Sequence, residues 1–295
     1  MRVSAVLPVY GPTFATRREH LELIIDSRFE IKLVIVADSF EDKDLSSLSK
    51  LIDTTESTDV KLVTGIFGNP GSARNAGLEL VDTDWVCFWD SDDLPKQDSF
   101  LRMIESADKE HFQIAKGIYQ IENANNNQRV TVEREFIDNE SPERHLLDPG
   151  IWRYAFSKKI YQKVRFPPLK MGEDQDFLVQ ALLSKKPVYQ SSEVVYVYRI
   201  GHSPQLSREK SAFVDASKSL ELLKDLLDKH RGDQLASRII LTSYLKQLFS
   251  LIKHSGIRNL DFHQSKTVSV IFSSLFRGVL VKPFSMIVRE ALVRR

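Results

Sequence analysis

Short apolar runs alternate with amphipathic stretches through the first third of the chain. The last of these runs, Trp85–Trp89, is apolar throughout, as expected for a strand that is covered on both faces. The stretches between them carry apolar residues three and four positions apart, which is typical of helices. Strands that alternate with helices indicate an α/β fold with a doubly wound, mostly parallel sheet and helices on both faces. We predict strands at Val3–Val9, Ile31–Ala37, Val60–Thr64 and Trp85–Trp89, and helices at Arg17–Arg28, Leu45–Ile52 and Ser72–Val81.

The remaining sequence mixes strand and helix patterns and then becomes helical from Arg208 onward, where leucine and isoleucine recur at helical spacing. We therefore divide the chain into an α/β domain at 1–207, with halves at 1–95 and 96–207, and a helical region at 208–295. Further strands are predicted at Gln113–Glu122, Val130–Phe136, Ile151–Phe156 and Val194–Arg199, helices at Phe100–Lys109, Lys158–Val164 and Asp174–Ser184, and a loop at 138–150.

The composition is that of a globular protein: 42% of the 295 residues are hydrophobic and 27% are charged. The single cysteine, Cys87, cannot form an internal disulfide and indicates a reducing compartment such as the cytosol. We expect no signal peptide, because the first residues lack a long apolar core. We also expect no transmembrane helix, because no run of 18 residues is free of polar side chains.

Charge is distributed unevenly along the chain. Residues 1–150 hold 16 basic and 28 acidic side chains, a net charge of −12, whereas residues 151–295 hold 25 and 12, a net charge of +13. Acidic residues can hold a divalent cation, and basic ones can meet phosphates or an anionic membrane. Ordinary solvated surface is the alternative explanation. The first domain has no basic stripe with interleaved aromatic residues, so we expect no nucleic-acid partner.

Three carboxylates, Asp90, Asp92 and Asp93, directly follow the apolar run that ends at Trp89. Burying ionised carboxylates without a partner is costly. Residues i and i+2 of an extended segment point the same way, so Asp90 and Asp92 can converge on one ligand. Mg²⁺ or Mn²⁺ suits oxygen ligands and usually takes one or two carboxylates together with phosphate oxygens. Alternatively, the acids are simple turn residues, as we interpret Asp82-Thr83-Asp84.

The segment Gly68–Gly77 opens a helix after a strand, a place where anionic phosphate binds readily. It lacks both the Lys-Ser/Thr of a Walker A loop and the spacing of G-x-G-x-x-G, which weighs against kinases, ATPases and dinucleotide enzymes. Arg74 can donate to a phosphate or a base carbonyl, or it can be an exposed residue behind a helix cap.

Gly172-Glu173-Asp174 begins a predicted helix. Acidic residues in a first turn interact favourably with the helix dipole, which is a purely structural explanation. The functional alternative is a general base, for which a carboxylate near the transferred proton is suitable.

Over residues 1–207 the sequence resembles the family 2 glycosyltransferases, because these motifs occur in the family's order and spacing. The resemblance implies the GT-A fold, a Rossmann-like nucleotide-sugar-binding sheet, in a non-processive enzyme of bacterial surface-polysaccharide type. The matching segments are Leu7–Tyr10, Asp38–Ser39, Gly71–Leu78, Phe88–Asp93, Val164–Pro167 leading to Gly172–Asp174, and Tyr196–Ile200.

The resemblance also implies the reaction: a metal-dependent, inverting transfer of a sugar from a nucleoside-diphosphate donor, with UDP preferred by family habit, to a saccharide or lipid-linked acceptor. It implies Asp174 as the catalytic base and Glu173 as a residue that helps place the acceptor. It implies Mn²⁺ or Mg²⁺ at Asp92, with Asp90 and His202 as further candidate ligands. The residues implied to contact the nucleotide sugar are Pro8, Val9, Tyr10, Asp38, Arg74, Asn75, Asp90, Ser91 and Asp93.

The sequence departs from the family pattern at two places. The family often shows Asp-Asp-Gly-Ser after the second strand, whereas Ala37-Asp38-Ser39-Phe40 keeps one aspartate, and His202 is displaced by one position. The Gln-x-x-Arg-Trp signature of processive synthases is missing from the sequence, which indicates one sugar per encounter. Trp152 and Tyr154 are candidates for stacking on the acceptor, or else core aromatic residues.

The C-terminal segment Val268–Val293 combines an apolar face with basic residues, and Pro283 would kink it. This pattern is typical of interfacial helices on an anionic membrane, although a packed subdomain or a dimer interface would also explain it. Polyprenyl-linked acceptors lie at membranes, so we expect a cytoplasmic enzyme that is peripheral on the inner face of the plasma membrane. The resemblance implies a role in capsule or lipopolysaccharide assembly.

Two other classes of function are weighed against glycosyl transfer. A nucleotidyltransferase that makes nucleotide sugars also uses such a sheet, but it has a glycine-rich basic loop where this chain has Tyr10-Gly11-Pro12-Thr13. A non-catalytic nucleotide-sugar-binding module would have no need of Asp90, Asp92 and Asp174.

Overall fold

The computed structural model describes residues 1–25, 30–54, 59–124, 126, 128–132, 141–201, 210–255 and 283. The chain divides into two compact units. The sheet unit comprises Met1–Asp138, Gly150–Pro168 and Lys186–Pro204, and the helical unit comprises Asn139–Pro149, Leu169–Lys185 and Gln205–Arg295. The predicted boundary near residue 207 lies outside the described residues. Residues 139–149 and 169–185, which we assigned to the first domain, group with the C-terminal helices instead.

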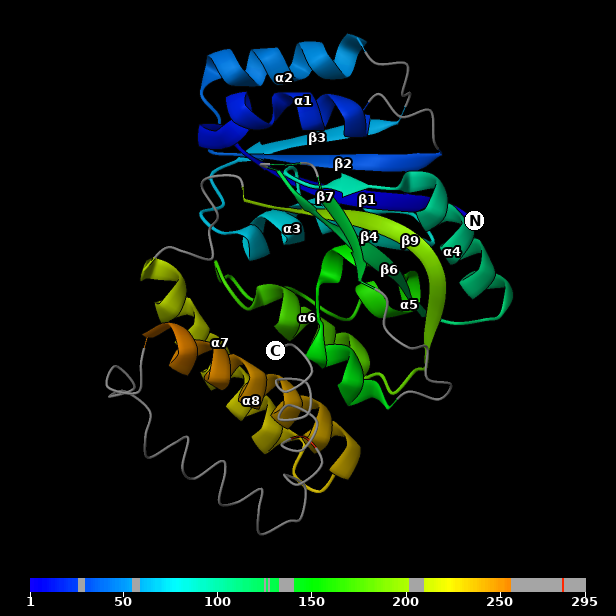
Figure 1. The fold of residues 1–295 in the computed structure, drawn as a ribbon, viewed down its shortest axis with the longest axis vertical. Helices are drawn as coiled ribbons and strands as arrows, with labels where there is room; N and C mark the ends of the chain where they lie inside the picture. The colour runs from blue at the N-terminus through cyan, green and yellow to red at the C-terminus, as the bar shows by residue number, and fades with distance from the viewer. Residues whose placement is uncertain are drawn as a thin grey trace. The chain divides into compact units, whose positions relative to one another are not determined.

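Four parallel strands that alternate with helices build the first half of the sheet. These elements are β1 (Val3–Tyr10), η1 (Gly11–Thr13), α1 (Phe14–Ile25), β2 (Ile31–Asp38), α2 (Asp42–Thr54), β3 (Val60–Gly65), α3 (Pro70–Leu78) and β4 (Trp85–Phe88). The strands lie in the order β3-β2-β1-β4. Helices α1 and α2 cover one face and α3 covers the other (Figure 1). Because the strands are parallel, their carboxyl ends meet at one edge of the sheet.

The second half of the sheet is mixed. Its elements are β5 (Leu94–Pro95), α4 (Gln97–Lys109), β6 (Ile114–Asn123), β7 (Gln128–Val132), η3 (Ile151–Arg153), β8 (Tyr154–Ser157), α5 (Lys158–Tyr161) and β9 (Val188–Ile200). The order continues β4-β8-β6-β9-β5, and β7 pairs with β6. Strand β9 runs parallel to β6, whereas β8 is antiparallel to both β4 and β6.

The structure confirms the predicted α/β fold and differs from the prediction in local details. The apolar run at Ile151 begins as a 3₁₀ helix, and the strand starts only at Tyr154. Strand β9 begins at Val188, six residues before its predicted start, because the polar segment 189–193 extends the sheet through pairing with β6. That pairing shifts register between Lys116 and Tyr119.

Two glycines let α3 pack closely in the sheet unit. A Cβ on Gly77 would stand 2.5 Å from a methyl group of Val6 on β1, and a Cβ on Gly71 would stand 2.0 Å from the carbonyl oxygen of Pro167. Any larger residue would push the helix away from these neighbours. The side chain of Asn69 caps the helix by accepting from the backbone N–H of Ser72 at 2.8 Å.

The helical unit contains η2 (Pro142–Leu147), α6 (Glu173–Leu182), α7 (Lys210–Lys229) and α8 (Gln234–Ser255). Helix α6 packs against α7, α8 and η2. Within the predicted loop at 138–150, residues 142–147 form the short helix η2. Among the helices that the structure describes, none is long and apolar enough to cross a membrane. The predicted interfacial segment Val268–Val293 lies outside the described residues, apart from Pro283.

Candidate functional site

The carboxyl ends of the parallel strands bring the predicted donor-binding residues to one edge of the sheet unit. Tyr10 of β1 pairs with Asp38 of β2, and Asp38 pairs with Gly65 of β3. Next to β1, the backbone N–H of Trp89 donates to the carbonyl oxygen of Val6 at 3.0 Å, which extends β4 toward Asp90. Tyr10 is 46% exposed at this edge. Pro8 is half-buried and Val9 fully buried, so Val9 offers only its backbone to a ligand.

Asp38 is buried and holds the loop that follows β3. One of its carboxylate oxygens accepts from the backbone N–H of Phe67 at 2.8 Å and from the hydroxyl of Ser39 at 2.9 Å. Ser39 has a φ of 57°, a left-handed conformation that is uncommon for a residue other than glycine. The altered Asp38-Ser39 turn is therefore fixed by its own hydrogen bonds.

Asp90 is paired with Arg74 of α3. A terminal nitrogen of Arg74 lies 2.8 Å from a carboxylate oxygen of Asp90, and the guanidinium lies 5.5 Å from the ring centre of Phe166. Arg74 is buried, so it is not the exposed surface residue of the alternative interpretation. Burial raises the pKa of Asp90, Arg74 acts against that rise, and the charge of Asp92 adds to it.

Asp92 is paired with an arginine that the sequence analysis did not single out. Arg17 of α1 places one terminal nitrogen 3.1 Å from a carboxylate oxygen of Asp92 and the other 3.4 Å from the hydroxyl of Ser91. The sequence did contain a signal for Arg17: α1 follows β1 after only the three residues of η1, so its first turn lies at the carboxyl edge of the sheet. The arrangement brings two guanidinium groups to the aspartate segment, one from each side.

Asp93 is turned inward and is 1% exposed. Its carboxyl accepts from the backbone N–H of Arg199 at 2.8 Å and is also hydrogen-bonded to the hydroxyl of Tyr196. The same hydroxyl accepts from the backbone N–H of Asp90 at 3.0 Å. Burial raises the pKa of Asp93 well above its usual value, and Asp92 and Asp90 add to the rise. Asp93 thus ties the aspartate segment to β9.

The aspartate segment can hold a hard divalent cation if phosphate oxygens supply part of the coordination. Within the described residues, no group of three or more His, Cys, Asp or Glu side chains is arranged to hold a metal ion. Asp92, however, remains partly exposed, and a cation that uses one or two carboxylates together with phosphate oxygens needs no larger protein set. Asp90 and Asp92 therefore fit Mg²⁺ or Mn²⁺ when phosphate oxygens complete the set of ligands. His202 lies outside the described residues.

Asn75 uses both ends of its side-chain amide on the backbone of Phe166. The amide nitrogen donates to the carbonyl oxygen of Phe166 at 2.8 Å, and the amide oxygen accepts from the N–H of the same residue at 3.0 Å. This double hydrogen bond is a structural link between α3 and the segment before Pro167. The nucleotide contact predicted for Asn75 stays a prediction.

The two candidate acceptor residues have different environments. Trp152 stacks on Tyr196 at 4.6 Å and on Tyr198 at 5.4 Å between ring centres, and it remains partly exposed. Tyr154 is fully buried beside Phe156, so its ring has no face on which a sugar could stack. Of the two roles considered for Tyr154, that of a core aromatic residue fits the structure.

The predicted catalytic carboxylates lie in the helical unit, at the start of α6. Gly172 precedes the helix with a φ of 89°, and Glu173 and Asp174 form its first turn. Asp174 accepts from the backbone N–H of Gln175 at 2.7 Å, and negative charge is favourable at this end of a helix. The neighbouring Asp176, which the sequence analysis passed over, is buried and hydrogen-bonded to α7 and α8.

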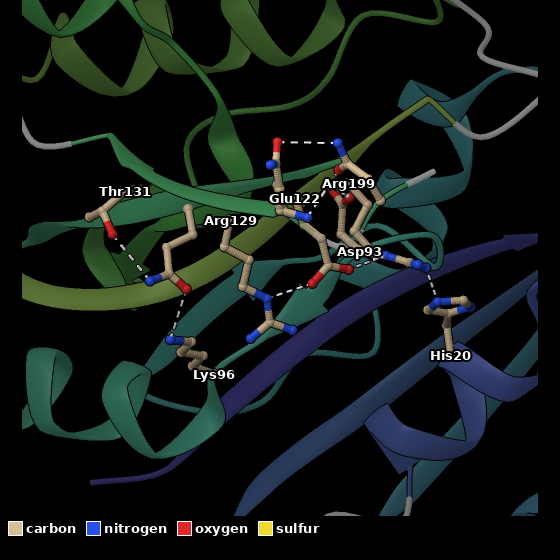
Figure 2. A network of polar contacts seen from close by, with 10 residues as sticks. His20, Asp93, Lys96, Glu122, Arg129, Thr131 and Arg199 are labelled. Atoms are coloured by element: carbon tan, nitrogen blue, oxygen red, sulfur yellow. Dashed lines mark hydrogen bonds and ion pairs between the residues drawn. The ribbon is translucent and has the colours of Figure 1, made fainter. Parts of the chain in front are cut away.

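A further polar network lies on β6, β7 and β9 of the sheet unit (Figure 2). Buried Glu122 accepts from Arg129 and, at 2.8 Å, from Arg199, whose guanidinium also contacts His20 of α1. Neither Glu122 nor Arg129 belongs to a sequence motif. Because only the folded sheet brings them together, the sequence carries no signal for this pair.

Comparison with known proteins identifies the relatives of this chain. The family model described as "Glycosyl transferase family 2" matches residues 4–171. A poly(ribitol-phosphate) beta-glucosyltransferase of Bacillus spizizenii is 22% identical over 283 residues, covering 92% of this chain and 42% of the relative. The poly(ribitol-phosphate) beta-N-acetylglucosaminyltransferase TarS of Staphylococcus aureus is 24% identical, covering 87% and 46%. The chain thus spans less than half the length of these two relatives.

Solved structures share the fold. The structure of residues 1–349 of S. aureus TarS in complex with UDP-GlcNAc matches with a TM-score of 0.69 and 19% identity, over 90% of this chain and 78% of that one. A mannosyltransferase from Pyrobaculum calidifontis in complex with GDP-Man and Mn²⁺ matches with a TM-score of 0.51 and 13% identity, over 99% and 86%. At these identities the likeness is one of fold.

Proposed function

The chain belongs to glycosyl transferase family 2. From this premise we propose that it is a glycosyltransferase that moves a sugar from a UDP-linked donor, with a divalent cation, to a hydroxyl group of a cell-surface glycopolymer or its lipid-linked precursor. The UDP preference is supported by the fold shared with a UDP-GlcNAc complex. Membership of this family weighs against the nucleotidyltransferase and the non-catalytic binding module.

One observation carries the proposal: the aspartate segment Asp90–Asp93 lies at the carboxyl edge of the parallel strands and is paired with Arg74 and Arg17. Ligands of α/β sheets bind at that edge. In the proposal, Tyr10 and Asp38 border the nucleobase at the same edge.

Asp92, with Asp90, would hold the cation. When bound, the cation would neutralise charge on the departing diphosphate. The guanidinium groups of Arg74 and Arg17 donate hydrogen bonds to the same phosphate oxygens, which stabilises the leaving group as its charge develops. Both arginines are supported in this role by their position beside the aspartate segment.

Asp174 is the proposed general base. Its carboxylate takes the proton of the acceptor hydroxyl while the hydroxyl oxygen attacks the anomeric carbon from the face opposite the diphosphate. The bond from the anomeric carbon to the phosphate oxygen breaks, and its electron pair leaves with the nucleoside diphosphate. Attack from the opposite face inverts the anomeric centre.

Calorimetric titration tests the donor site. UDP, GDP, CDP and dTDP are titrated with and without Mn²⁺ into the wild type, Asp92→Ala and the control Asp82→Ala, which removes the same charge from an exposed position. We expect metal-dependent binding of UDP that is lost in Asp92→Ala and kept in Asp82→Ala. The proposal is wrong if folded protein binds none of the four nucleotides, or if Asp92→Ala binds UDP and Mn²⁺ like the wild type.

A further inference from the structure

Glu122 of β6 is a buried carboxylate that holds two arginines. It is 5% exposed and accepts from the Nε of Arg129 on β7 and, at 2.8 Å, from the Nε of Arg199 on β9 (Figure 2). Burial acts to raise the pKa of Glu122, but the hydrogen bonds and charges of Arg129 and Arg199 outweigh it and lower the pKa. One negative charge therefore meets two guanidinium groups that are always protonated.

Within the described residues, Arg129 donates to Glu122 through its Nε. Its side chain is 48% exposed, and within the described part of the chain its one carboxylate partner is Glu122. Figure 2 shows its two terminal nitrogens outside the dashed contacts of the network. A guanidinium that is fixed through Nε and presents both terminal nitrogens is suited to bind an anion with two oxygens.

Lys96 adds a second cation to the same face. Its amine donates to the side-chain oxygen of Gln120 at 3.3 Å, and Gln120 donates in turn to Thr131. Gln120 and Glu122 are two residues apart on β6, so their side chains lie on one face of the sheet. Because Gln120 is neutral, the charge of Lys96 adds to that of Arg129 on this face.

The position of this face relates it to the acceptor rather than to the nucleotide. In the sheet order β3-β2-β1-β4-β8-β6-β9, Tyr10 and Asp38 lie on β1 and β2, before the aspartate segment that follows β4. In the same order, strands β6 and β9 come after β4, so they lie on the other side of the aspartate segment from β1 and β2. The connection to it is direct, because the backbone N–H of Arg199 donates to Asp93 at 2.8 Å.

We propose that Arg129, oriented by Glu122 and assisted by Lys96, binds a phosphodiester group of the acceptor beside the donor sugar. This inference rests on the proposed glycosyl transfer. A phosphodiester offers two anionic oxygens to the two terminal nitrogens of Arg129. The acceptor class is then a polyol-phosphate or sugar-phosphate polymer, in keeping with the two relatives named for poly(ribitol-phosphate).

The test measures binding of a short ribitol-phosphate oligomer to protein that is saturated with UDP and Mn²⁺. Free ribitol is the uncharged probe, and oligogalacturonate is an anionic probe that carries carboxylates. The variants are Arg129→Gln, Arg129→Lys and the control Arg102→Gln. Arg102 is a half-exposed arginine of the same unit that also pairs with a glutamate, Glu193.

We expect the ribitol-phosphate oligomer to bind in a salt-dependent manner, and free ribitol and oligogalacturonate to bind at least tenfold more weakly. Loss of a charge-assisted hydrogen bond should weaken oligomer binding by about tenfold or more in Arg129→Gln. Arg129→Lys should restore it only in part, because lysine lacks the planar pair of donors. Arg102→Gln should bind like the wild type, and all variants should keep their affinity for UDP.

Three results would overturn the inference while leaving the proposed donor site intact: equal oligomer binding by Arg129→Gln and Arg102→Gln, equal binding of free ribitol and the oligomer, or oligogalacturonate binding as tight as that of the oligomer. A parallel loss of UDP affinity in Arg129→Gln would assign Arg129 to the donor instead, and also overturns it. Failure of the proposed function is a different result, since the wild type would then bind no UDP.

Discussion

Replacing Asp176 with asparagine should remove a pH dependence from the stability of the helical unit. Asp176 is 5% exposed on α6. Its two carboxyl oxygens lie 2.9 and 2.8 Å from the hydroxyl of Ser219, and Gln247 donates to it at 3.3 Å. Burial raises the pKa of Asp176 to about 8, against the effect of the two hydrogen-bond donors and with a further contribution from Asp174 and Glu173.

The size and sign of the effect follow from linkage between protonation and folding. An unfolded aspartate has a pKa of about 3.9, so between about pH 4 and pH 8 the folded protein holds one proton more than the unfolded chain at Asp176. The free energy of unfolding therefore falls as the pH rises, by up to about 1.4 kcal/mol per pH unit. Summed over the interval, the loss is of order 5 kcal/mol, comparable with the whole stability of many domains.

Urea unfolding at pH 5.0, 6.5 and 8.0 measures this loss. The wild type should lose several kcal/mol between pH 5.0 and 8.0. Asp176→Asn should lose less than the wild type, because asparagine removes the proton of Asp176 while the raised pKa values of Asp90 and Asp93 still contribute. The control is Asp225→Asn, an exposed aspartate of α7, which should keep the wild-type slope. Stability curves of the wild type and Asp176→Asn that run parallel with pH would refute the reasoning.

Three further predictions concern catalysis and packing. Asp174→Asn should lower kcat by about 10²- to 10⁴-fold and leave the affinity for UDP unchanged in calorimetry; unchanged turnover would exclude Asp174 as the base. Gly77→Ala should lower the free energy of unfolding in urea by about 1–3 kcal/mol, because its Cβ would stand 2.5 Å from a valine methyl group of β1. The control Gly68→Ala should lower it less despite the positive φ of Gly68, because open space surrounds that position. Asn75→Ala should destabilise the sheet unit by about 2 kcal/mol, because both backbone polar groups of Phe166 lose a partner; a loss of UDP affinity without a loss of stability would show that Asn75 acts on the nucleotide.

The fold could be predicted largely because its central parallel strands β1, β2 and β4 are mostly apolar. Burial on both faces is found for Trp85–Phe88 and Ile31–Asp38. It can be predicted from their mostly apolar sequences. The two-residue strand β5 carries no such pattern, since Leu94 and Pro95 become a strand only through pairing with Val197 and Tyr196 of β9. Likewise, periodicity within one helix does not reveal that α6 groups with helices much later in the chain.

The candidate site was predictable where its chemistry is local in sequence. Asp90, Asp92 and Asp93 are adjacent, and their charge after an apolar strand is informative by itself. Their partners are distant: Arg17 and Arg199 reach the segment from 74 and 106 residues away. An arginine is common on any surface, so its role becomes visible only when the sheet brings it to a carboxylate.

The burial of Asp176 has a consequence for the order in which the protein is completed during synthesis. Domains generally fold as their residues leave the ribosome, starting from the N-terminus. The strands of the sheet unit are complete once Ile200 has been made, but the partners of Asp176 are Ser219 and Gln247, on the two helices that follow. The turn that carries Glu173 and Asp174 therefore reaches its final packing only after α8 emerges. A nascent chain whose strands are already complete still lacks the final packing around Asp174, the proposed base.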